Sequence, residues 1–217
     1  MIRIRKSELV PQSLSAPDCS RYDGHDVQQQ LYADQDGKCY LCEQQTGKDY
    51  QIEHFKPKAE GFFPELEFDW RNLFLSCPYC NGRKPNSFTN LLNPTSNNNE
   101  EIIEQRISFG TSKINLKSEV DTAEVNQTIQ LLDKLLNGTP GVRDERTQIL
   151  YEDIKQEITF FMELLAEYKK SRNETIKDAI IASLDIRKEF LGLKYWIIKD
   201  ASGLYVEFSP YLIWNKQ

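Results

Sequence analysis

Two closely spaced pairs of cysteines constrain the fold of this chain more than any other feature of its sequence. The pairs are Cys39-Tyr-Leu-Cys42 and Cys77-Pro-Tyr-Cys80. Four thiols at this spacing suit one tetrahedral zinc ion, because each pair grips the metal through a tight two-residue turn. Two redox pairs, two disulfides or an iron site are the alternatives. The segment between the pairs is longer than in an ordinary zinc ribbon, which predicts a structured insertion.

The composition predicts an ordinary soluble protein whose thiols stay reduced. Of its 217 residues, 39% are hydrophobic and 28% charged, which allows one or two domains with a real core. The basic start at Met1 lacks the apolar stretch of a secretory signal. We therefore expect a cytoplasmic protein, in which paired cysteines bind metal more often than they form disulfides. Cys19 is left over and is expected to be a small packed thiol.

The charge balance is acidic, with a net charge of −6 and a pI of about 5.1. A protein that binds nucleic acid by itself usually carries a basic surplus, since neutralising phosphates supplies most of the affinity. The segment between Asp69 and Glu100 holds no acidic residue but contains Arg71, Arg83 and Lys84. This pattern predicts a small positive patch, as in a catalytic subunit whose grip on substrate comes partly from another protein.

Turn-rich boundaries divide the chain into three expected parts. Residues 1–35 form an arm with one helix, residues 36–94 form the cysteine module, and residues 95–217 form a mostly helical region that docks a partner. In the module we expect a strand that ends at His54 and a second extended segment that leads to Cys77. A helix should begin at Cys77, because proline at the next position suits a first helical turn.

Apolar residues of the third part recur at helical spacing. One stripe steps by three or four residues along Leu150, Ile154, Ile158, Phe161, Leu165 and Tyr168. A run of leucines ahead of Asn137-Gly138 marks an earlier helix, and Ile176, Ile180 and Leu184 mark a later one. These stripes predict either a small helical core or a docking surface, and one helix can provide both.

The insertion between the cysteine pairs carries the candidate chemistry. Glu53 and His54 place a hard carboxylate beside a group that accepts a proton near neutral pH. Asn72 follows, and Asn81 comes directly after the last cysteine. An acidic-His pair, a central Asn-Leu and a Cys-x-x-Cys-Asn-x-x-Lys run occur here in that order. In this respect residues 39–84 resemble the HNH endonucleases of the cysteine-containing type.

The resemblance implies an α+β fold, in which a zinc-stapled ββα-metal HNH finger precedes a mainly helical C-terminal region. It implies that His54 is the general base, that Asn72 fixes its ring, and that Glu53 and Asn81 hold one divalent cation. Oxygen ligands favour Mg²⁺ or Mn²⁺ in this position. The family commonly has His where Asn81 stands and Asp where Glu53 stands. A helix cap is the alternative for Asn81.

The basic pair after Asn81 has two interpretations. Arg83 and Lys84 are expected to contact phosphate, helped by the start of a helix. A solvated basic turn is the alternative.

Beyond the finger, the chain resembles the HNH subunit of Septu-type anti-phage systems, including retron-associated versions. Leu91-Leu-Asn-Pro94, Thr128-Ile-Gln-Leu-Leu and the helix start at Arg143–Arg146 carry this likeness. It implies a toxic effector with a PtuA-like ATPase partner and, in retron versions, a reverse transcriptase with its DNA–RNA hybrid. The substrate stays open between DNA and RNA such as tRNA, because the site reads a phosphodiester and not a base. A catalytically inactive zinc-finger module or an adaptor is the competing function.

Overall fold

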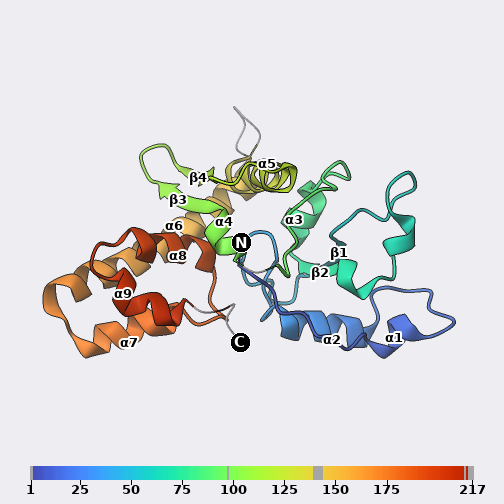
Figure 1. Ribbon diagram of the computed structural model, residues 1–217, viewed down its shortest axis with the longest axis horizontal. Coiled ribbons are helices and arrows are strands. Elements are labelled where there is room, and N and C mark those ends of the chain that lie inside the picture. The colour runs from blue at the N-terminus through green and yellow to red at the C-terminus, as the bar shows by residue number, and fades with distance from the viewer. Residues whose placement is uncertain (1, 97, 139–143, 213, 215–217) are drawn as a thin grey trace.

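The computed structural model describes residues 2–96, 98–138, 144–212 and 214. The chain forms two pairs of strands and a series of helices (Figure 1). The helices are α1 (Gln12–Ser15), α2 (His25–Asp34), α3 (Pro78–Arg83), α4 (Asn99–Ile102), α5 (Ala123–Asn137), α6 (Glu145–Ser171), α7 (Glu174–Ser183), α8 (Leu191–Asp200) and α9 (Tyr205–Phe208). The strands are β1 (Gln51–His54), β2 (Leu73–Ser76), β3 (Glu104–Ser108) and β4 (Lys113–Lys117). Among the described residues, none of the helices is long and apolar enough to cross a membrane.

The cysteine module folds as the predicted ββα finger. β1 and β2 are antiparallel, and His54 at the end of β1 lies opposite Leu73. The second strand begins at Leu73, because the Asp69 side chain accepts a hydrogen bond from Arg71 N and holds Trp70–Asn72 in a 3₁₀ turn. α3 follows directly, with Cys77 as its N-cap and Pro78 in its first turn.

The N-terminal arm packs against the back of the finger. Val27 and Leu31 of α2 are fully buried against Leu73 and Leu75 of β2. The indole N–H of Trp70 also donates to the Ser7 carbonyl at 2.8 Å. Arm and finger therefore share one core and support each other.

The C-terminal region confirms the helical stripes. Every residue of the stripe on α6 is buried. The helix begins at an N-cap, Asp144, whose carboxylate accepts from Thr147 N at 3.0 Å. α5 ends at Asn137, and Gly138 follows with a positive φ of 80°. The strands β3 and β4 pair antiparallel as a hairpin.

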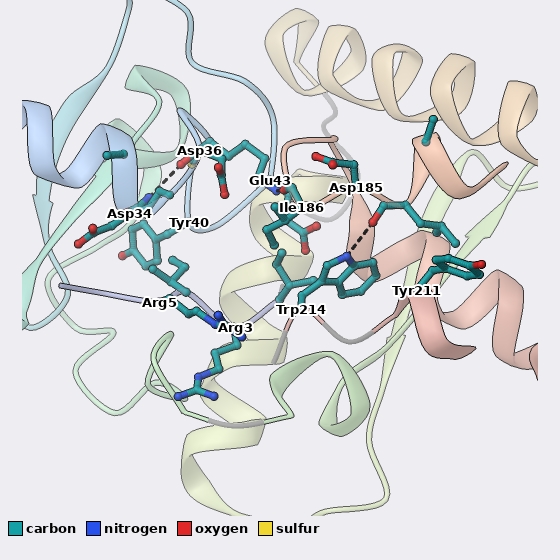
Figure 2. A pocket seen from close by; sticks show the side chains of 18 of the residues that line it. Arg3, Arg5, Asp34, Asp36, Tyr40, Glu43, Asp185, Ile186, Tyr211 and Trp214 are labelled. Carbon is teal, nitrogen blue, oxygen red and sulfur yellow. Dashed lines mark hydrogen bonds between the residues drawn. The ribbon is translucent and has the colours of Figure 1, made fainter. Parts of the chain in front are cut away.

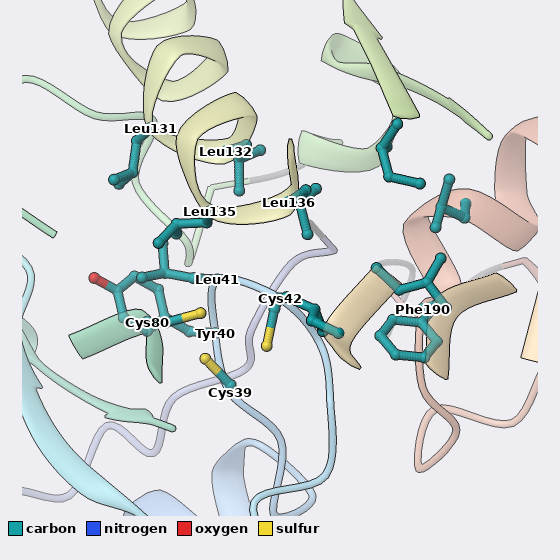
Figure 3. Packing of buried hydrophobic residues seen from close by; sticks show 14 of the residues in the cluster. Cys39, Tyr40, Leu41, Cys42, Cys80, Leu131, Leu132, Leu135, Leu136 and Phe190 are labelled. Atoms are coloured by element: carbon teal, nitrogen blue, oxygen red, sulfur yellow. The ribbon is translucent and has the colours of Figure 1, made fainter. Parts of the chain in front are cut away.

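The finger and the helical region meet in a continuous hydrophobic core (Figure 3). From the finger, both cysteine turns contribute Cys39, Tyr40, Leu41, Cys42 and Cys80. From the other side, α5 contributes Leu131, Leu132, Leu135 and Leu136. The thiols thus lie under apolar side chains and not at an open surface, so the helical region helps to enclose the cluster.

Candidate active site

The four sulfur atoms of the cysteine pairs gather at one point. Their Sγ atoms all lie within 4.8 Å of one another, and those of Cys42 and Cys77 are 3.9 Å apart. A tetrahedron with zinc–sulfur bonds of about 2.3 Å has sulfur–sulfur edges of roughly 3.8 Å, so the cluster fits zinc. Burial alone would raise the pKa of the Cys39 thiol, but contacts with the other three thiols bring it well below its ordinary value. Contacts with Cys39 raise the pKa of the Cys42 and Cys80 thiols. The cluster therefore favours one thiolate at Cys39, and a bound zinc ion would hold the other cysteines as thiolates as well.

Glu53 is a buried carboxylate with a donor on each oxygen. Lys84 Nζ donates to Oε1 at 2.6 Å, and the Tyr40 hydroxyl donates to Oε2. Lys84 also donates to the His54 carbonyl at 2.9 Å, so it links the two residues of the Glu-His pair. Burial raises the pKa of Glu53, while Lys84 and Tyr40 oppose that rise. From the sequence, Tyr40 was not predicted to belong to the site, and Lys84 was expected to contact phosphate. Tyr40 directly follows Cys39, and Lys84 lies one helical turn after Cys80. This nearness to the cysteine pairs is the signal that could have identified both as partners of Glu53.

His54 is oriented by a backbone carbonyl. Its Nε2 lies 2.9 Å from the Glu67 oxygen, and because a carbonyl only accepts, Nε2 carries the proton and Nδ1 keeps a free lone pair. The ring of Tyr22 packs edge-on at 4.6 Å between centroids. Burial lowers the pKa of His54, and the nearby Lys58 lowers it further. The result is a neutral imidazole with an available acceptor nitrogen, as a general base requires.

The Glu67 carbonyl takes the role expected of Asn72 as the hydrogen-bond partner of His54 Nε2. The Oδ1 of Asn72 accepts from Lys56 N at 2.7 Å, and its Nδ2 donates to the carbonyls of Lys56 at 2.9 Å and Leu66 at 3.1 Å. These three bonds fasten both ends of the loop that runs from β1 to Glu67. Asn72 therefore acts on the His54 ring indirectly. It fixes the loop that carries Glu67, and the Glu67 carbonyl orients the ring.

Asn81 lies inside α3 and faces β1. The helix cap is Cys77, so the capping alternative for Asn81 does not hold. Its Nδ2 donates to the Gln51 side chain at 2.6 Å. Since alternate residues of a strand share a face, Gln51 places Asn81 on the same side of β1 as Glu53. The two expected cation ligands therefore come from facing elements, and both offer the oxygen atoms that a hard cation prefers.

Arg83 and Lys84 both have partners within the chain. The Arg83 guanidinium pairs with the carboxylate of Asp144 and lies 4.6 Å over the ring of Tyr79. The Lys84 side chain is only 2% exposed. A phosphate contact from either residue would have to break an existing ion pair, so the expected positive patch is smaller than the sequence suggested.

Replacing Arg83 with alanine is expected to lower the melting temperature slightly and to leave nucleic-acid affinity unchanged within about twofold, because a half-exposed ion pair contributes little. Thermal unfolding and fluorescence anisotropy would measure the two effects. Arg71→Ala, which removes an exposed arginine of the same module, is the matched comparison. A loss of affinity in Arg83→Ala that exceeds the loss in Arg71→Ala would restore Arg83 as a phosphate contact.

Replacing Lys84 with methionine is expected to destabilise the zinc-loaded protein by about 3 kcal/mol, because it leaves a buried carboxylate without its cation. Urea unfolding would measure the loss. The double variant Lys84→Met/Glu53→Gln should recover most of it, since no buried charge remains. Lys58→Met is the control: its partner Glu67 is 35% exposed, so the loss there should stay below about 1 kcal/mol. Equal losses in the two methionine variants would contradict this account.

A cavity of about 720 Å³ lies between the N-terminal segment and α7 (Figure 2). Arg3, Asp36, Asp185 and Trp214 are among the residues around it, and the finger contributes Cys39, Tyr40 and Glu43. Glu53 and His54 do not line this cavity. The cavity therefore lies apart from the candidate chemistry, and we assign it no part in the reaction.

Comparison with known proteins supports this interpretation of the site. Residues 39–87 match the HNH endonuclease family model. The chain is also similar to the Septu protein PtuB of Bacillus thuringiensis, with 31% identity over 113 residues that cover 48% of this chain and 43% of that protein. The chain thus spans less than half the length of this relative. The zinc-type cluster, the ββα fold and the family match agree, and residues 39–87 therefore form a domain of the HNH endonuclease family.

Proposed function

We propose that the chain is a cation-dependent endonuclease that hydrolyses phosphodiester bonds of nucleic acid. One observation carries the proposal: the Glu67 carbonyl holds the His54 imidazole at the end of β1, and His54 follows the buried residue Glu53 directly in the chain. Water attack on a phosphodiester requires a base for the nucleophile and positive charge near the leaving oxygen. The finger offers the first through His54 and a place for the second between Glu53 and Asn81.

In this mechanism each residue has a separate task. His54 takes the proton of the attacking water at Nδ1, while the Glu67 carbonyl keeps Nε2 protonated and the ring fixed. Glu53 and Asn81 would hold a divalent cation, Mg²⁺ or Mn²⁺, which would supply positive charge to stabilise the negative charge that develops in the reaction. Asn72 keeps the intervening loop in place. The four cysteines hold zinc, which takes no part in the chemistry.

The similarity to PtuB supports a role in anti-phage defence. We infer a toxic cytoplasmic effector that works with a PtuA-like ATPase, and in retron-type systems with a reverse transcriptase and its DNA–RNA hybrid. The net charge of −6 and the internal pairing of Arg83 and Lys84 support dependence on a partner, since neither of these two cations is available to phosphate without breaking an ion pair.

One observation favours a second function. Lys84 neutralises Glu53 inside the finger, as would suit a module that binds nucleic acid or a partner without cutting. In that case Lys84 replaces the cation permanently, and His54 is a packed histidine that takes no part in a reaction.

Cleavage assays with the zinc-loaded chain, alone and with the ATPase, would separate the two functions. Supercoiled plasmid, linear duplex, single-stranded DNA and tRNA are the substrates, each with Mg²⁺, Mn²⁺ or chelator. We expect internal cuts that need the cation, that are faster with the partner, and that are lost in Glu53→Gln. If the zinc-loaded complex cuts none of the substrates, the binding-module function is correct. If Glu53→Gln cuts as fast as the unchanged protein, Glu53 does not hold the cation of the reaction and the proposed mechanism is wrong.

A further inference from the structure

Each cysteine turn contains a tyrosine, and the two hydroxyl groups point to different parts of the molecule. Tyr79, in the second turn, donates to the Leu135 carbonyl at 2.7 Å and lies 2.8 Å from the Thr147 hydroxyl. It therefore connects the finger to α5 and α6. Tyr40, in the first turn, donates to Glu53 Oε2. The first turn thus has a direct contact with the candidate catalytic carboxylate.

Tyr40 is held firmly where it meets Glu53. It is 3% exposed, its backbone N–H donates to the Leu75 carbonyl at 3.1 Å, and its ring packs 5.2 Å from that of Phe74. Its neighbour Cys39 is one of the four sulfur ligands, and Figure 3 shows Tyr40 close to the sulfur atoms of the cluster. Because the side chain has little freedom, the position of its hydroxyl depends on the position of the turn.

The opposite oxygen of Glu53 is held from the second cysteine turn. Lys84 follows Cys80 by one helical turn, and its backbone N–H donates to the Cys80 carbonyl at 3.0 Å. Its ammonium group reaches Glu53 Oε1 at 2.6 Å. Each oxygen of the carboxylate is therefore anchored to a different half of the zinc cluster, one through Tyr40 and the other through Lys84.

We propose that Tyr40 is a positioning residue that couples the zinc cluster to the cation site of the nuclease. By holding Oε2, its hydroxyl turns Oε1 toward α3, which carries Asn81 and ends at the C-cap residue Lys84. A cation held by Glu53 would bind on this side and would displace or share the contact of Lys84 with the carboxylate. This inference rests on the proposed function, since it assumes that Glu53 binds the cation of the reaction.

Tyr40→Phe tests the coupling, because it removes one oxygen atom and keeps the buried ring. We expect the Mn²⁺ dissociation constant to rise about tenfold, as is usual when a residue that orients a metal ligand is lost. Electron paramagnetic resonance of free Mn²⁺ would measure it on the zinc-loaded full chain. The Mn²⁺ concentration needed for half-maximal cleavage should rise by the same factor, while the rate at saturating Mn²⁺ stays within about threefold.

Tyr79→Phe is the matched control, since it removes the hydroxyl of the other cysteine turn, which contacts α5 and α6. It should change the Mn²⁺ dissociation constant by less than about twofold. Zinc content and circular dichroism are measured on both variants. Unchanged Mn²⁺ binding in Tyr40→Phe would overturn the proposal, and so would loss of zinc, which would place the role of the hydroxyl in the turn itself.

The outcomes also separate this inference from the proposed function. If Tyr40→Phe weakens Mn²⁺ binding but no form of the protein cuts nucleic acid, the coupling between the zinc cluster and the cation site is supported, and the nuclease function is wrong. If Glu53→Gln abolishes cleavage while Tyr40→Phe needs no more Mn²⁺ than the unchanged protein, the nuclease stands and the coupling falls. If the unchanged protein binds no Mn²⁺, both fall.

Discussion

Replacing Cys80 with serine is expected to remove zinc and to unfold the finger. The four thiols meet between β2, α3 and the first cysteine turn, and binding of a structural zinc ion supplies about 10 kcal/mol or more of folding energy. The short β1–β2 pair has little else to hold it, since an isolated hairpin is marginally stable at best. Zinc analysis, circular dichroism and hydrogen exchange of the β1 amides would report the loss, and cleavage should vanish with it.

Cys19→Ser is the control for that experiment. Cys19 lies outside the cluster, and its Sγ contacts the Arg21 carbonyl at 3.6 Å. This variant should keep one zinc ion per chain and an unchanged melting temperature. A Cys80→Ser protein that retains full zinc and the melting temperature of the unchanged chain would show that the cluster does not hold the finger together.

Replacing His54 with alanine is expected to reduce cleavage by about 10³-fold, within the range for loss of a positioned general base. The ring is the acceptor that the attacking water needs, and its orientation is set by the Glu67 carbonyl. Zinc content and secondary structure should be retained, since His54 lies outside the thiol cluster. Single-turnover cleavage of the best substrate, with the partner present and Mn²⁺ saturating, is the measurement.

His25, the other of the two histidines in the chain, is the matched control. His25 is exposed at the first residue of α2, so His25→Ala should cut at the rate of the unchanged protein. If His54→Ala also cuts within about tenfold of that rate, His54 is not the base.

Much of the fold could be predicted, because it follows from local patterns. The alternation that ends at His54 gave β1, and the stripe from Leu150 to Tyr168 gave α6. The sequence pattern did not predict α8, and the reason is physical. Nearly all of its residues from Leu191 to Ile198 are buried, so it lacks the polar face that makes a helical period visible.

The sequence predicted the segment of the candidate site but not the connections within it. The family-like order of Glu53, His54, Asn72 and Asn81 identified the right segment. The partner that orients His54 is a backbone carbonyl, which any residue could supply and no motif records. The contact between Glu53 and Lys84 spans 31 positions in the sequence, and only the packing of α3 on β1 brings the two residues together.

We propose that zinc builds the site while a second cation at Glu53 takes part in the reaction. The most direct measurement is cleavage by the unchanged chain with its partner, after a chelator treatment that removes weakly bound cations but leaves one zinc per chain. We predict that cleavage stops in this zinc-only protein and returns when Mn²⁺ or Mg²⁺ is added, with zinc content constant. Undiminished cleavage by the zinc-only protein would contradict the account.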